Sequence, residues 1–154
     1  MLEQYQKDVA DRGRLGVPPL PLNAKQTEDI IRLLTQGHDK PRLLLDLLAD
    51  RVEPGVSKAA AIKAAWLEQV ALGAAHVPDL TPETAVAMLG QMGGGYNVAA
   101  LIRLLQKTEL AAFAAQALKG VTKIYEAFEQ VVALAGKNPA AMEVLESWAA
   151  AEWF

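Results

Sequence analysis

The side chains that could perform chemistry in this 154-residue chain are few and widely separated. His38 and His76 are the only histidines, and each has an aspartate close after it that could orient an imidazole for acid–base or metal chemistry. Neither has a second histidine four residues away, and the sequence contains no HExxH motif. We therefore interpret both as exposed loop residues.

Two pairs of glutamates have the i, i+3 spacing of a dimetal site on helices, Glu126 with Glu129 and Glu143 with Glu146. Such a site also needs a histidine on the same helix, and neither segment has one. Solvated helix faces are the favoured interpretation. The sequence thus predicts no catalytic residue and no bound metal or cofactor.

The glycine run 93–95 could cradle a phosphate, but it is not followed by Lys-Ser/Thr and does not have the GxGxxG spacing. Because glycine readily adopts positive φ, we interpret the run as a sharp turn between two helices.

The chain has no cysteine, which excludes disulfides, thiolate nucleophiles and any zinc or iron–sulfur site held by its own thiolates. Residues 1–58 hold nine basic and nine acidic side chains, and residues 59–154 hold six and nine, so the net charge of −3 arises in the second part. This balance lacks the basic excess of a dedicated nucleic-acid binder. Arg42 and Arg51, with Lys58 and Lys63, give only a weak RNA-binding pattern.

The elements that must position these residues are helices, because apolar side chains recur at three-to-four spacing along most of the chain. The pattern predicts an all-α single domain, 1–154, of about nine helices and no strand. Residues 1–16 form an N-terminal helix, residues 17–22 (VPPLPL) an extended strap, and residues 23–154 a series of helical hairpins. A PxxP docking motif in the strap is the less favoured interpretation.

Helix starts are marked by capping residues. Asn23 with Gln26 forms a capping-box pattern, and Ser57, Thr81-Pro82 and Asn138-Pro139 begin later helices. Further helices are expected over 109–118 and 121–135, separated by Gly120.

The hairpins recur at intervals of roughly 25 to 35 residues but without strict sequence identity, which favours a HEAT-like array of antiparallel helical hairpins, an α–α superhelix, rather than a clean repeat. A compact helical bundle is the alternative. The two architectures differ in shape, since only the array is elongated and offers a long binding surface.

No apolar run is long enough to span a bilayer, and the charged N-terminus does not resemble a signal peptide, so we expect a cytoplasmic protein that does not bind membranes. Trp148, Trp153 and Phe154 crowd the last seven residues. Core packing explains Trp148, whereas the final two aromatic residues would be costly in water. We expect a following domain there, and we take these three aromatics, with Arg42 and Arg51, as candidate interaction residues.

Three segments closely resemble the N-terminal HEAT-like domain of the bacterial aconitase B family: LLDLLADRVEPGVSKAAAIKAAWL, TPETAVAMLGQMGGGYNVAALIRLL and ESWAAAEWF. The resemblance covers nearly the whole chain, and RVEPGV, GGYN and SWAAAEWF are its most specific parts.

The resemblance implies a longer parent enzyme, a cytoplasmic lyase of the citric acid cycle with a 4Fe-4S cluster. That enzyme interconverts citrate and isocitrate and also acts in the methylcitrate cycle, as a 2-methylisocitrate dehydratase. The cluster ligands and the substrate-binding residues lie in later domains, so no active-site residue transfers to this chain. For this domain the resemblance implies a non-catalytic role in protein–protein contact: homodimerisation, shaping of the substrate tunnel and association with other metabolic enzymes. The alternative that it implies is an iron-responsive mRNA-binding module.

Overall fold

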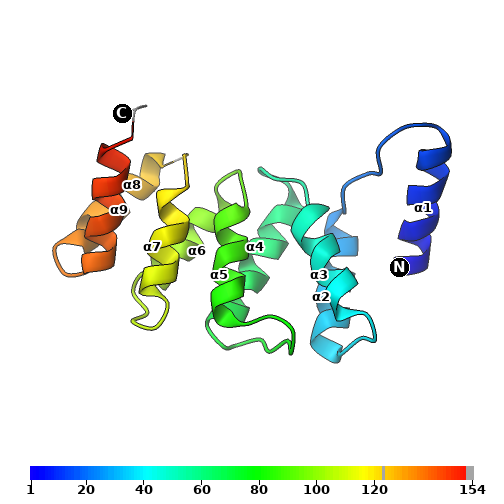
Figure 1. Ribbon diagram of the computed structural model, residues 1–154, viewed down its shortest axis with the longest axis horizontal. Coiled ribbons are helices and arrows are strands. Elements are labelled where there is room, and N and C mark those ends of the chain that lie inside the picture. The colour runs from blue at the N-terminus through cyan, green and yellow to red at the C-terminus, as the bar shows by residue number, and fades with distance from the viewer. Residues whose placement is uncertain (123, 152–154) are drawn as a thin grey trace.

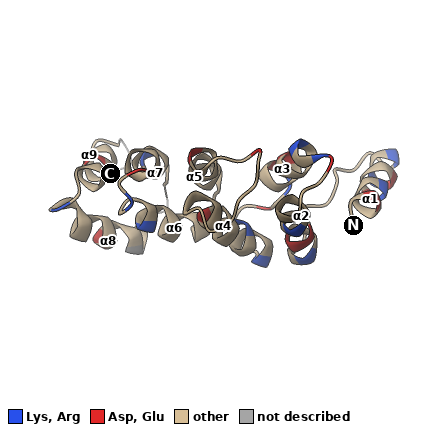
Figure 2. Ribbon diagram, turned by 90° about the horizontal axis from the view of Figure 1, so that it is seen from below, with Lys and Arg blue, Asp and Glu red and all other residues tan. Residues whose placement is uncertain are grey.

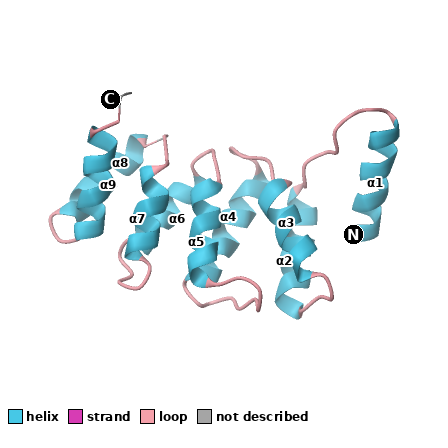
Figure 3. Cartoon of the chain, in the orientation of Figure 1, coloured by secondary structure: helices cyan, strands magenta, loops and turns pink. Residues whose placement is uncertain are grey.

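The computed structural model describes residues 1–122 and 124–151, and these residues form nine helices in an elongated array (Figure 1). The helices are α1 (Leu2–Arg14), α2 (Ala24–Gln36), α3 (Pro41–Asp50), α4 (Lys58–Ala71), α5 (Pro82–Gln91), α6 (Tyr96–Leu104), α7 (Ala111–Lys119), α8 (Tyr125–Ala135) and α9 (Pro139–Ala149). Loops connect them, and the described residues include an isolated bridge, Val77 with Leu80, but no strand (Figure 3). The all-α prediction is therefore confirmed.

The helices form two layers (Figure 2). One layer contains α2, α4, α6 and α8, and the other contains α3, α5, α7 and α9. Helices contact their neighbours along a layer, as in α2–α4–α6–α8 and α5–α7–α9, and also their hairpin partners across the layers. Because each hairpin packs mainly on the adjacent ones, the molecule extends in one direction. This arrangement is consistent with the predicted HEAT-like array and differs from a compact bundle.

Helix starts lie where the capping residues predict them. Asn23 Oδ1 accepts a hydrogen bond from the Gln26 amide at 2.9 Å, and Gln26 Oε1 accepts one from the Asn23 amide at 3.0 Å, which confirms the capping box. Ser57 and Thr81 cap α4 and α5 through single side-chain bonds. These contacts satisfy amides that have no partner within their helix.

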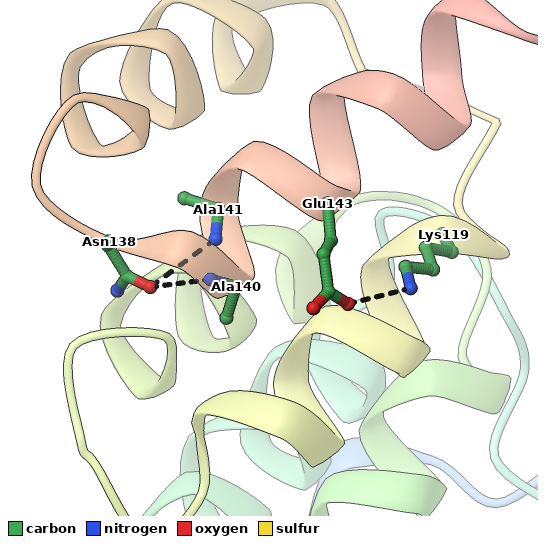
Figure 4. Close-up of polar contacts among 5 residues, drawn as sticks. All are labelled: Lys119, Asn138, Ala140, Ala141 and Glu143. Atoms are coloured by element: carbon green, nitrogen blue, oxygen red, sulfur yellow. Dashed lines mark hydrogen bonds and ion pairs between the residues drawn. The ribbon is translucent and has the colours of Figure 1, made fainter.

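Asn138 caps α9 and also ties it to another hairpin. Its Oδ1 accepts from the amides of Ala140 at 3.0 Å and Ala141 at 3.3 Å (Figure 4). Its Nδ2 donates to the carbonyl of Leu105, just after α6, at 2.7 Å. One amide side chain therefore fixes both the start of α9 and its position against α6.

Two predicted boundaries are wrong by a few residues. The structure begins α7 at Ala111 rather than at residue 109, and α8 at Tyr125 rather than at residue 121. The Val121 amide donates to the Leu118 carbonyl at 3.0 Å, which closes a turn at the end of α7. Val121 and Thr122 are β-branched and therefore poor at extending a helix. Residue 123 lies outside the described part of the chain.

The N-terminal end of the array is held together by Arg51. Its guanidinium donates to the Tyr5 hydroxyl at 3.0 Å and to the Pro19 carbonyl at 2.8 Å. The Arg51 carbonyl accepts from the Leu22 amide at 2.7 Å. One residue after α3 thus joins the end of α3 to both α1 and the strap.

Candidate interaction surface

A cavity of about 470 Å³ opens where the α3–α4, α5–α6 and α7–α8 loops meet. We call it the glycine cleft, because each of these three loops contributes glycine to its wall. Its lining residues are Pro54, Gly55, Gly90, Gln91, Met92, Gly93, Gly94, Gly95, Asn97, Val98, Gly120, Val121 and Thr122. None of these residues has a titratable side chain, so they offer main-chain and amide groups rather than an acid or a base.

The predicted glycine turn has an additional role, because two loops touch there. Gly94 has φ +93°, and a Cβ at this position would lie 2.2 Å from the Gly55 Cα and 2.5 Å from its nitrogen and oxygen. Gly55 itself has φ +117°. Only two glycines allow both these backbone conformations and this close contact of main chains.

Asn97 forms part of the wall and closes the end of α5. It is 1% exposed, and its Nδ2 donates to the carbonyls of Leu89 at 2.7 Å and Met92 at 2.8 Å. These carbonyls lie at the C-terminal end of α5 and just after it, where helix carbonyls commonly lack a full set of partners; the Leu89 carbonyl also accepts from the Met92 amide at 3.1 Å. The Asn97 Oδ1 is buried without a hydrogen-bond partner. The asparagine therefore joins α6 to α5 on the inner side of the glycine turn.

Lys63 is a buried charged residue that the sequence does not reveal. It is 5% exposed, and its Nζ donates to the Ala49 carbonyl at the end of α3 at 2.9 Å. Burial lowers the pKa of the Lys63 ammonium to about 8, and the nearby Asp50 carboxylate acts in the opposite direction. Lys63 therefore fills the α3–α4 contact and does not contribute to an exposed basic surface.

The candidate interaction residues fall into three groups. Trp148 is 1% exposed; its Nε1 donates to the Leu118 carbonyl at 3.0 Å, and its ring lies 6.5 Å from that of Phe128, so it belongs to the core. Trp153 and Phe154 lie outside the described residues. Arg42 is exposed at the start of α3, whereas the Arg51 guanidinium is engaged with α1 and the strap.

Of the residues weighed for metal or acid–base chemistry, His38 and Asp39 lie together, with His38 Nδ1 3.1 Å from Asp39 Oδ1. His76 is exposed as expected, whereas His38 is half-buried, so the expectation of an exposed residue is wrong for His38. The part of the chain that the structure describes contains no group of three or more His, Cys, Asp or Glu side chains that could hold a metal ion. Glu143 Oε2 accepts from Lys119 Nζ at 3.1 Å, which makes it part of an ion pair between α9 and α7 (Figure 4). The side chain of Glu126 lies outside the described set.

Large apolar side chains are exposed along the C-terminal half of the array. On the last three helices they are Phe113 on α7, Tyr125, Phe128 and Val132 on α8, and Met142 on α9. Exposed apolar patches commonly mark sites of protein contact. None of the described helices is long and apolar enough to cross a membrane.

Comparison with known families decides what kind of domain this is. The profile of the family described as Aconitate B N-terminal domain matches residues 4–154. The chain belongs to this family. The matched range, residues 4–154, agrees with the resemblance of the sequence segments over nearly the whole chain.

Three relatives of this chain are similar to it along its entire length. Aconitate hydratase B of Pseudomonas aeruginosa is 45% identical over 156 residues, that of Escherichia coli K12 45% over 157 residues, and that of Synechocystis 43% over 157 residues. Each alignment covers 100% of this chain but 18% of the relative. The chain thus spans less than a fifth of the length of these relatives.

Proposed function

We propose that this chain is the non-catalytic N-terminal interaction domain of a longer aconitate hydratase of the B type. The observation that supports this most directly is the exposure of large apolar side chains along α7–α9. A domain of this family that represents 18% of its relatives' length has other domains available to cover such surfaces. The interconversion of citrate and isocitrate is then performed by later domains.

The 4Fe-4S cluster implied by the family does not fit the donor set of this chain. Such clusters are held chiefly by cysteine thiolates, and the sequence contains no cysteine. No step of the reaction is therefore assigned to residues of this domain. Its contribution is to contact and position the rest of the enzyme.

An activity assay tests the non-catalytic role. The 154-residue chain, incubated with iron and sulfide under cluster-reconstituting conditions, is expected to show no citrate–isocitrate turnover. The longer enzyme treated identically serves as the positive control. Measurable turnover by the isolated chain would overturn the proposal.

Within this proposal the domain also contributes to homodimerisation of the enzyme and to its contacts with other metabolic enzymes. Light scattering of the chain over a range of concentrations, with and without ferrous iron, tests the first contribution. We expect the molar mass to rise with concentration. A concentration-independent monomer in both conditions would remove the dimerisation role. The mRNA-binding alternative stays a prediction.

A further inference from the structure

Helix α1 is attached to the rest of the array by few contacts. The structure describes this helix in full, and Tyr5 is its one buried side chain, whereas α4, which is of similar length, buries eight. The principal contacts between the described helices all join members of α2–α9, and α1 stands at the end of the array on a long loop (Figure 1). Segments with few buried apolar contacts are those that open most readily in a native protein.

Hydrogen bonds divide the segment between α1 and α2 into two parts. The first part is bonded to α1 itself, since Arg12 Nε donates to the Pro18 carbonyl at 2.7 Å. The second part is bonded to the array, because the Leu22 amide donates to the Arg51 carbonyl at 2.7 Å. Leu22 is also buried in the core.

Residues 1–18 therefore form one unit, which we call the arm, and residues 19–21 connect it to the array. Pro19 and Pro21 have no amide hydrogen to donate, and Leu20 between them is 59% exposed. The connection can bend without the loss of any regular secondary structure, as a hinge must.

The Arg51 side chain holds this connection closed. Its Nε donates to the Tyr5 hydroxyl in the arm at 3.0 Å, and its Nη2 donates to the Pro19 carbonyl in the hinge at 2.8 Å. Among the hydrogen bonds of the described residues, the one between Arg51 and Tyr5 alone joins the arm to the array. Apolar contact adds to it, because Leu2 and Val9 pack against the core beside Tyr5 and are partly buried.

Charge contributes less to the attachment. The pKa of Asp29 on α2 is lowered chiefly by its hydrogen bond with Arg32, and the Met1 amine in the arm is the smallest of the causes. The arm is thus held mainly by Arg51 and by the apolar side of α1.

We propose that the arm is a cap that opens as a unit about residues 19–21 while α2–α9 stay folded, with Arg51 as its latch. Opening frees the Tyr5 ring and uncovers the part of the core against which it packs. The arm therefore controls when an apolar contact surface at the N-terminal end of the array becomes available. Such a cap would operate whether or not the domain has the function proposed above.

Hydrogen exchange of the 154-residue chain, followed by mass spectrometry, tests this cap. We expect protection factors of α1 amides to be at least about a hundredfold lower than those of α4–α6. Exchange of α1 should not respond to urea well below the unfolding transition, because local opening exposes little surface.

Arg51→Lys tests the latch, because lysine keeps the charge but loses the fork of the guanidinium. R51K should speed the exchange of α1 about tenfold and leave that of α4–α6 unchanged. R42K is the matched control, since Arg42 is exposed at the start of α3, and it should change neither rate.

Thiol labelling gives a second measurement, because the chain has no cysteine. Val9→Cys places a thiol on the partly buried side of α1, and Ala10→Cys places one on its exposed side. R51K should raise the N-ethylmaleimide labelling rate of V9C about tenfold and leave that of A10C nearly unchanged. Tyr5→Phe removes the hydroxyl but keeps the ring, so it should also speed V9C labelling, and it serves if R51K does not fold.

Three results would overturn the inference. Equal protection and equal urea dependence of α1 and α4–α6 would mean that α1 is an integral part of the array. An effect of R51K or Y5F on α1 no larger than that of R42K would mean that Arg51 is not the latch. Faster exchange of α1 and α4–α6 alike in R51K would mean that Arg51 stabilises the whole domain instead of holding an arm.

Discussion

Replacement of each glycine in the run 93–95 by alanine should separate two requirements of the glycine turn. One is a backbone with positive φ, and the other is space for the α3–α4 loop. The added methyl group meets a different environment at each position. At Gly93 it would lie 3.4 Å from the Pro54 Cβ, an ordinary contact. At Gly95 it would meet nothing within 4 Å, but φ is +112°. At Gly94 the positive φ is combined with the 2.2 Å approach to the Gly55 Cα.

The expected losses of stability follow from these contacts. A non-glycine residue in such a backbone conformation costs ~1–3 kcal/mol. Overpacking adds ~1–3 kcal/mol, and here the obstacle is main chain, which cannot rotate away. We therefore expect G94A to lower the free energy of unfolding by about 4 kcal/mol, as the sum of both effects. G95A should cost about 2 kcal/mol, and G93A less than about 1 kcal/mol.

Urea and thermal unfolding followed by circular dichroism measure these differences. Because 1 kcal/mol shifts Tm by ~2–4 °C in a domain of this size, G94A should melt about 10 °C lower than the parent chain. The order G94A, G95A, G93A, from least to most stable, is the decisive result. If G94A were no less stable than G95A, the close contact between the α3–α4 and α5–α6 loops would not exist as described.

Three further changes test other contacts. N97A should lower the free energy of unfolding by about 2 kcal/mol, because the Met92 carbonyl loses the Asn97 donor and the Leu89 carbonyl keeps only the Met92 amide; urea titration measures this loss. N138A should cost about 2 kcal/mol, more than an exposed cap, because the Leu105 carbonyl loses its partner as well; hydrogen exchange should show a loosened start of α9. The pKa of Lys63 is lower in the folded chain, about 8 against 10.5, so the unfolded chain binds more protons between these values. Stability should therefore rise with pH across that window, by up to ~1.4 kcal/mol per pH unit, and K63M should abolish the rise; a pH-independent difference between K63M and the parent chain would contradict this.

The starts of most helices could be predicted from the sequence because capping is a local interaction. Asn23 meets Gln26 three residues away, and the bond depends on little beyond those residues. The start of α8 could not be predicted in this way, since it has no side-chain cap and its apolar pattern begins before the helix does. Periodicity shows that a segment is helical but does not locate its first turn.

The candidate interaction residues show where sequence reasoning ends. Arg51 and Lys63 both resemble parts of a basic surface in the sequence. In the fold, Arg51 reaches the hydroxyl of Tyr5, 46 residues away, and Lys63 is buried against the end of α3. A long cationic side chain can point to solvent or toward a carbonyl at a helix end, and only the packing of neighbouring helices decides which.

By itself, the sequence determined the helical class of this domain, most helix starts and its family, because spacing, caps and motifs are properties of short segments. The tertiary structure alone decided that Gly94 faces Gly55, that Lys63 is buried, and that Phe113, Val132 and Met142 stay exposed. These features depend on which segments become neighbours across the array. Sequence periodicity marks a side chain as apolar, but it does not indicate whether another element covers that side chain.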